Sequence, residues 1–135
     1  MENSNYLHSD LSSKIIKAFY NVYNTLGFGF LEKVYENAMM IELRKFNLTC
    51  KQQQHIDVFY DSEKVGDYYA DIIVEDKIII ELKAAKTIVD EHEAQLVNYL
   101  RATDIEVGLL LNFGEIPKHI RRVLTEEYKN HNKSV

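Results

Sequence analysis

The sequence predicts an α/β domain in which a mixed β-sheet of about four strands is flanked by helices on both faces. Three observations predict it. The apolar periodicity gives elements in the order α-α-β-β-β-α-β-α over 135 residues. The helix between the third and fourth strands makes a crossover, which joins parallel strands and covers a sheet face. Hydrophobic residues make up 46% of the chain, with five Gly and one Pro, so a packed core is favoured over disorder.

The first two predicted elements are helices. Residues 9–25 carry apolar side chains at helical spacing, with Ser9 or Asp10 as the N-cap, and the segment Gly27-Phe28-Gly29 ends this helix. A second helix is predicted over about residues 30–46. Its inward face is expected to comprise Leu31, Val34, Tyr35, Ala38 and Ile41.

Three strands follow. Residues 52–60 alternate as a strand does, and residues 61–64 have the composition of a turn. Residues 68–74 and 78–83 are rich in β-branched side chains and flank Glu75-Asp76-Lys77, which predicts a hairpin.

The last third of the chain is predicted to add a helix, a strand and a final helix. Asp90 and Glu93 are spaced as a capping box for a helix that ends near Thr103. Residues 106–113 form an apolar strand, and the final helix is expected over about residues 118–128. The domain then covers residues 9–128, between a flexible N-terminus (1–8) and a flexible tail (129–135).

Composition limits the classes of function. Cys50 is the one cysteine, so an internal disulfide and a Cys-rich zinc site are excluded and a reducing compartment is favoured. No apolar run is long enough to span a membrane, and the first residues lack a secretory signal, so we expect a cytoplasmic protein. The net charge is −5, which excludes a basic footprint over the whole molecule. Residues 61–93 hold ten acidic side chains against four lysines, which fits a solvated surface or a cation site.

The predicted hairpin brings two carboxylates together. If Glu75, Asp76 and Lys77 form a three-residue loop, Asp71 lies opposite Glu81 with Cβ atoms roughly 4.5–5.5 Å apart. Opposed like charges destabilise a sheet, whereas a divalent cation between them is stabilising. Mg²⁺ suits one or two carboxylates plus waters and phosphate oxygens. Lys83 shares this face because side chains alternate along a strand.

The triplet Glu-x-Lys is weak on its own, because it occurs three times in this chain. Only Glu81-Leu82-Lys83 follows an apolar strand and has an Asp ten residues upstream. The alternative for these residues is a structural ladder of salt bridges. A different loop length would place Asp71 and Glu81 on opposite faces.

Further motifs carry a resemblance to a known family. They are, in order, Gly29/Glu32/Tyr35, Ala70-Asp71, Glu81-Leu82-Lys83, Gln95 with Tyr99, and Leu111-Asn112-Phe113-Gly114. In this ordered set the chain resembles the GxxExxY proteins, a small branch of the PD-(D/E)XK nuclease-like superfamily with RecB-like motifs. The resemblance runs from about Ser9 to Leu124. It departs at Ala70, where the superfamily name implies proline.

The resemblance implies a restriction-endonuclease-like core that hydrolyses phosphodiester bonds in DNA or RNA with Mg²⁺ or Mn²⁺. It implies Asp71 and Glu81 as metal ligands, Lys83 as the catalytic lysine and Glu32 as a further acid near the metal. Gln95 is implied as a polar contact to the site or to a phosphate, and Tyr99 and Tyr35 as supports. For a phosphate backbone, the predicted basic contacts are Lys118, Arg121 and Arg122.

Each of these residues also has a structural interpretation. Glu32 fits a first-turn carboxylate favoured by the helix dipole, and Arg121 and Arg122 fit solvated charges. Three hypotheses therefore stand: a metal-dependent nuclease, a catalytically weak nuclease-fold module that binds nucleic acid or a protein partner, and a structural protein that buries these charges as salt bridges. The sequence leaves monomer and homodimer open.

Overall fold

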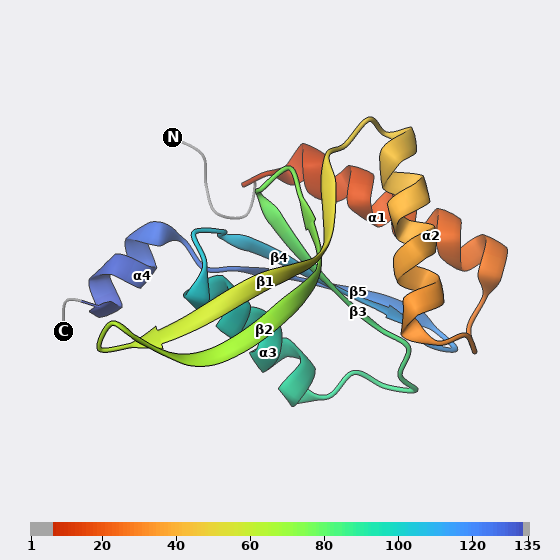
Figure 1. The fold of residues 1–135 in the computed structure, drawn as a ribbon. Coiled ribbons are helices and arrows are strands. Elements are labelled where there is room, and N and C mark those ends of the chain that lie inside the picture. The colour runs from red at the N-terminus through yellow and green to blue at the C-terminus, as the bar shows by residue number, and fades with distance from the viewer. Residues whose placement is uncertain (1–6, 134–135) are drawn as a thin grey trace.

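A computed structural model describes residues 7–133 and the side chains of residues 7–130. It contains one five-stranded sheet with helices on both sides (Figure 1). The elements are α1 (Ser9–Leu26), α2 (Glu32–Lys45), β1 (Cys50–Tyr60), β2 (Glu63–Val74), β3 (Ile78–Lys83), α3 (Asp90–Ala102), β4 (Val107–Phe113), β5 (Pro117–Val123) and α4 (Glu126–Lys133).

The sheet is mixed, as predicted. Its strands lie in the order β1-β2-β3-β4-β5. Only β3 and β4 are parallel, and α3 makes the crossover between them; the other neighbours are antiparallel. The mixed α/β architecture is therefore confirmed, with one strand more than expected.

The extra strand is β5, and the helix predicted over residues 118–128 is wrong. Residues 117–123 pair along the whole of β4, and a helix begins only at Glu126. The spacing of Ile120, Val123 and Leu124 fits a helix, but it also fits a strand with Val123 on one face and Ile120 and Leu124 on the other, as their packing shows. The open edge of β4 decides between them, because its buried backbone groups need partners.

Two apolar clusters cover the two faces of the sheet. The larger packs α1 and α2 against one face, around Phe19, Met39, Ile80 and Leu111. The smaller packs α3 against the other face, around Ile79, Leu96 and Leu110. Gly108 in β4 is needed there, because a Cβ would lie 2.6 Å from Leu96 Cδ1.

The inward face of α2 differs from the predicted one. Leu31, Val34 and Ile41 are exposed, at 81%, 40% and 51%. Tyr35 and Ala38 face the core as predicted, but the buried stripe continues through Met39 and Leu43, together with Glu36. The apolar residues of this helix permit two stripes, and the loop before it selects one, because the Tyr35 hydroxyl donates to Gly27 O (2.7 Å) and its ring stacks on Phe113 (4.1 Å).

The predicted caps are also wrong. His8, in the left-handed region with φ 54°, precedes α1 in place of a Ser9 or Asp10 cap. Val89 precedes α3, and its backbone N–H donates to His92 Nδ1 (3.3 Å), so His92 takes the position expected of Glu93.

The long hairpin of β1 and β2 extends beyond the rest of the sheet. In Figure 1 it reaches out above α3, toward the side where α4 lies. Its pairing with β3 is short, from Val74↔Ile78 to Ile72↔Ile80. We call the part of this hairpin beyond the pairing with β3, residues 54–70, the arm.

The alternation of side chains between the two faces of the sheet is interrupted where the arm leaves β3. Gln53 and Asp71 form no pair between Gln52↔Ile72 and Gln54↔Ala70, and Gln53 has φ 49°. Ala70 and Ile73, three residues apart, consequently pack in the same apolar cluster against α3. Such irregularities bend a strand and re-aim its side chains.

The ends of the chain bear on the predicted domain limits. Residues 1–6 and 134–135 of the predicted flexible termini lie outside the described residues. α4 extends to Lys133 over residues that were assigned to the tail. Buried Lys129 anchors this helix by donating to Thr103 O and Ile105 O, both at 2.8 Å. Within the described part of the chain, no helix is both long and apolar enough to cross a membrane.

Candidate active site

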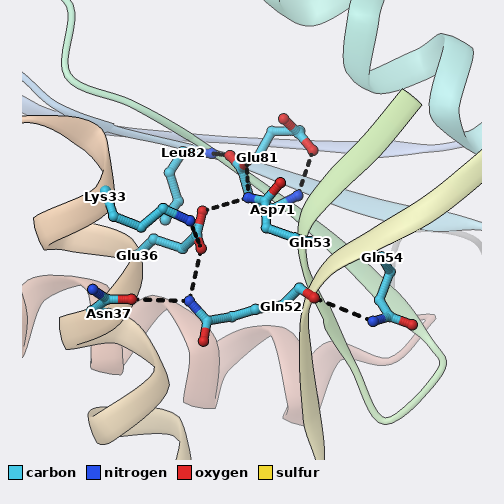
Figure 2. A network of polar contacts seen from close by, with 9 residues as sticks. All are labelled: Lys33, Glu36, Asn37, Gln52, Gln53, Gln54, Asp71, Glu81 and Leu82. Atoms are coloured by element: carbon cyan, nitrogen blue, oxygen red, sulfur yellow. Dashed lines mark hydrogen bonds and ion pairs between the residues drawn. The ribbon is translucent and has the colours of Figure 1, made fainter. Parts of the chain in front are cut away.

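Asp71 and Glu81 meet where the pairing of β2 with β3 ends. The β2–β3 turn has the predicted register, with Val74 opposite Ile78. One residue beyond the last pair, Ile72↔Ile80, side chains take the place of the backbone hydrogen bonds between the two strands. The backbone N–H of Leu82 donates to Asp71 Oδ2 (2.8 Å), and that of Asp71 donates to Glu81 Oε1 (3.1 Å), as Figure 2 shows. The two carboxylates predicted to adjoin therefore do so.

Burial changes the proton affinity of both carboxyls. Glu81 is 5% exposed, and desolvation together with the charge of Asp71 raises its pKa to about 9. Desolvation and the nearby charge of Glu36 raise the pKa of Asp71, against the hydrogen bond from Leu82. A buried carboxylate pair without a cation thus favours its protonated form.

Lys83 ends β3, two residues after Glu81. Its positive charge lowers the pKa of both Asp71 and Glu81, which places the ammonium within electrostatic reach of the pair. The side chain is half-buried. Its backbone pairs with Asn112 of β4, so the position of Lys83 is set by the parallel half of the sheet.

Glu36 of α2 supplies a third carboxylate that the sequence analysis did not single out. It is 4% exposed and accepts hydrogen bonds from Lys33 Nζ (2.8 Å), Gln52 Nε2 (2.7 Å) and Gln53 Nε2 (2.8 Å). The Gln53 carboxamide also donates to Asp71 Oδ1 (3.3 Å) and so bridges the two acids (Figure 2). The left-handed backbone of Gln53 accompanies this bridge.

Glu32, predicted as the additional acid, is exposed in the first turn of α2. Glu36 lies one turn further along and inward. A signal was available, because Tyr35, Met39 and Leu43 form a second apolar stripe with Glu36 on its border. The role of Glu32 stays a prediction.

Gln95 and Tyr99 lie one turn apart on α3, and Gln95 Nε2 donates to the Tyr99 hydroxyl (2.6 Å). Desolvation raises the pKa of Tyr99, and the charges of Glu81 and Asp71 add to the rise. Tyr99 also packs in the same buried cluster as Ala70, the residue before Asp71, so the pair lies on the α3 side of the site.

Asn112 and Gly114 hold the segment that follows Lys83. Asn112 is buried and exchanges two hydrogen bonds with the backbone of Ala85, both 2.9 Å long. A Cβ at Gly114 would lie 2.7 Å from Ala85 O, so only glycine fits there. The amide of Asn112 continues the sheet pairing beyond Lys83.

The three predicted phosphate contacts all lie on β5, but their surroundings differ. Lys118 pairs with Asn112, which pairs with Lys83, so these residues form a row across three strands. Arg122 instead forms an ion pair with Glu93 of α3 (2.5 Å). Arg121 donates to the backbone oxygen of Leu7. Lys118 is the one of the three that lies level with the site.

A second acidic group lies on the arm. His55, Asp57 and Asp67 have ligand atoms within 4.8 Å of one another, the tightest such group among the described residues. His55 contacts Asp67, and Lys64 pairs with both Asp57 (3.0 Å) and Asp67 (3.7 Å). We call this set the arm cluster; its charges are already paired internally.

The residues of the site fit a hard divalent cation. Carboxylate oxygens are the ligands such ions prefer, and Asp71, Glu81 and Glu36 supply them from β2, β3 and α2. Burial and the charge of Asp71 raise the pKa of Glu81, so a bound cation would stabilise its carboxylate form. These carboxylates are more widely spaced than the arm cluster, with Gln53 between two of them.

Comparisons with known proteins bear on the family and the fold. The family model of the PD-(D/E)XK nuclease superfamily matches residues 9–123. The crystal structure of SSO0001 is similar over 96% of this chain, with a TM-score of 0.54 and 20% sequence identity, which shows a shared fold. This chain spans 66% of the length of SSO0001. None of the curated proteins matches it.

Proposed function

Because the chain belongs to the PD-(D/E)XK nuclease superfamily, we propose that it is a metal-dependent nuclease that hydrolyses phosphodiester bonds in DNA or RNA. The observation that carries the proposal is the meeting of Asp71 and Glu81 at the end of the β2–β3 pairing, with Lys83 two residues on. The finer assignment to the GxxExxY branch is part of the proposal.

The proposed ligands are Asp71 and Glu81, with Glu36 as the third acid. When bound, Mg²⁺ or Mn²⁺ supplies Lewis acidity toward the phosphodiester and compensates the negative charge of the carboxylates. Gln53 holds Glu36 and Asp71 in reach of each other. The proposal is supported by the burial of Glu81 beside Asp71, because a cation would compensate two carboxylates that desolvation otherwise keeps from ionising together.

Lys83 is proposed to orient the attacking water and to offset charge that develops on the phosphate. The backbone of Lys83 is held on β3 by its pairing with Asn112. The Tyr99 hydroxyl, held by Gln95, is proposed to order polar groups on the α3 side. Lys118 is proposed to contact a phosphate along the same row of the sheet.

The test is a cleavage assay on supercoiled, linear and single-stranded substrates with Mn²⁺. We expect cleavage by the wild type and a loss of roughly 10²–10³-fold in Lys83→Ala, the size seen when one charge-stabilising group is removed. Lys77→Ala is the matched control, because Lys77 is exposed just before the other end of the same strand. Equal losses in both variants, or cleavage that survives in Lys83→Ala, would contradict the proposed role.

A second candidate is a binding module of the same fold with negligible turnover. One observation favours it: Glu36 and Asp71 already have internal donors in Lys33, Gln53 and the Leu82 amide. On this hypothesis the site needs no cation. Calorimetric titration with Mn²⁺ separates the two, because only the nuclease hypothesis requires binding that Glu81→Ala abolishes.

A further inference from the structure

A groove runs beside the carboxylates, between α3 and the arm. Its volume is about 780 Å³, within the range of roughly 300–1,000 Å³ that small ligands occupy. In Figure 1 the arm crosses in front of α3. Residues of both elements line the groove. Val58 and Tyr68 line the groove on the arm side, and Ala94, Gln95, Asn98 and Tyr99 line it on the α3 side.

The groove adjoins the candidate active site through Tyr99. Tyr99 lines the groove and packs in the same buried cluster as Ala70, the residue before Asp71 in β2. Gln95 lines it and is bonded to the Tyr99 hydroxyl. A molecule in the groove would therefore lie next to the reacting groups.

The walls combine an aromatic face with side-chain amides. The rings of Tyr68 and Tyr99 lie 5.8 Å apart and are tilted by 52°. Tyr68 is 47% exposed, so part of its ring is open to a ligand. Gly66 leaves room for this ring, because a Cβ there would lie 3.1 Å from Tyr68 Cε2. On the opposite wall, Asn98 is held by Arg101 (3.2 Å).

The charge of the groove does not favour a phosphate and is compatible with a neutral nucleobase. Its charged lining groups are Asp57, which Lys64 pairs, together with Glu91 and Arg101. The lining therefore has no excess of positive charge to attract a phosphate. An unpaired nucleobase is neutral, stacks on an aromatic ring and presents hydrogen-bonding edges to amides and guanidinium groups.

We propose that this groove binds an unpaired nucleobase next to the bond to be cut, so that the enzyme acts on single-stranded or flapped nucleic acid. The inference rests on the proposed nuclease function. The Tyr68 ring stacks on the base, and Asn98 and Gln95 contact its edge. A base inside a duplex stays stacked in its helix and does not reach the groove.

The binding test uses a single-stranded oligonucleotide that carries one 2-aminopurine, with a blunt duplex of the same sequence beside it. All titrations use the Lys83→Ala background with Mg²⁺, so that turnover does not interfere. We expect quenching of 2-aminopurine on binding and preference for the single strand. Tyr68→Ala should weaken binding on the order of tenfold, the worth of one base–aromatic stack, whereas Tyr68→Phe keeps the affinity.

Tyr69→Ala is the matched control. Tyr69 is adjacent to Tyr68 and similarly exposed, at 53%, but its ring stacks on His55 away from the groove (5.1 Å). The groove proposal predicts unchanged affinity in Tyr69→Ala. Equal losses in Tyr68→Ala and Tyr69→Ala, no preference for the single strand, or no quenching would overturn it, and a lack of binding with capture of a peptide instead would assign the groove to a protein partner.

A parallel cleavage assay in the otherwise unchanged protein separates this proposal from the one on which it rests. If duplex and single strand are cut equally and Tyr68→Ala changes neither rate, the groove proposal fails and the nuclease stands. If no substrate is cut but single strands still bind in a Tyr68-dependent way, the groove stands and the nuclease function fails.

Discussion

The molecule carries two groups of acidic side chains that differ in burial and in the partners they have. Asp71, Glu81 and Glu36 lie at the junction of β2, β3 and α2, where Glu36 and Glu81 are 4% and 5% exposed. The arm cluster is largely exposed, and Lys64 forms ion pairs with both of its aspartates. The group with the closer ligand atoms is thus the less promising cation site. Closeness of carboxylates is a weak criterion; what distinguishes the first group is its burial, which penalises the uncompensated negative charges.

Neutralising one acid in each group tests this difference most strongly. Asp71→Asn keeps the acceptor for Leu82 N–H but removes a charge, so we expect Mn²⁺ affinity to fall about 10²–10³-fold, the cost of losing one buried charged partner. Asp67→Asn on the arm should leave the affinity unchanged. Isothermal titration calorimetry measures both. If Mn²⁺ affinity falls in Asp67→Asn and not in Asp71→Asn, the cation site is on the arm.

The second prediction concerns pH and stability. The pKa of Glu81 in the folded protein, about 9, lies above its ordinary value of 4.5. The folded state therefore holds an extra proton between these values, and the free energy of unfolding falls as pH rises through this window. Stability is greatest, with respect to this group, near pH 4.5 and below.

Glu81→Gln mimics the protonated form and removes that slope. In the metal-free protein we expect it to raise the free energy of unfolding by roughly 3 kcal/mol at pH 7, because each of the pH units between the ordinary pKa and pH 7 is worth about 1.4 kcal/mol. Urea unfolding at pH 5, 7 and 8.5 measures the effect. A variant less stable than the wild type at every pH would show that the carboxylate form is favoured.

The third and smallest effect is expected at Gln53, whose carboxamide bridges Glu36 and Asp71. Gln53→Ala removes the bridge, and we expect Mn²⁺ affinity to fall roughly 10–100-fold, as for other residues that orient ligands. Gln54→Ala is the control, because the Gln54 amide bonds only Gln52 O (3.2 Å). Gln53→Gly accommodates the same left-handed backbone and separates the loss of the amide from backbone strain.

The predictable part of the site comes from short-range geometry. A three-residue turn sets the register of β2 and β3, so the sequence suffices to bring Asp71 opposite Glu81. The order of elements up to β4 also follows from periodicity.

The part that could not be predicted depends on contacts distant in sequence. The stripe of α2 that turns inward is selected by Tyr35 against Phe113, and with it Glu36. The strand β5 is selected by the open edge of β4. Nothing in Gln52-Gln53-Gln54 indicates that Gln53 adopts φ 49°, because this conformation arises where the arm bends away from β3.

The early end of the β2–β3 pairing has a mechanical consequence. Beyond Ile72↔Ile80, no backbone ladder ties the arm to β3. The two hydrogen bonds between Asp71 and the Glu81-Leu82 segment replace it, and both use carboxylates. At this point the side chains of the two candidate metal ligands hold the base of the arm to β3. Each carboxylate therefore has two roles, one in the site and one in joining the two strands.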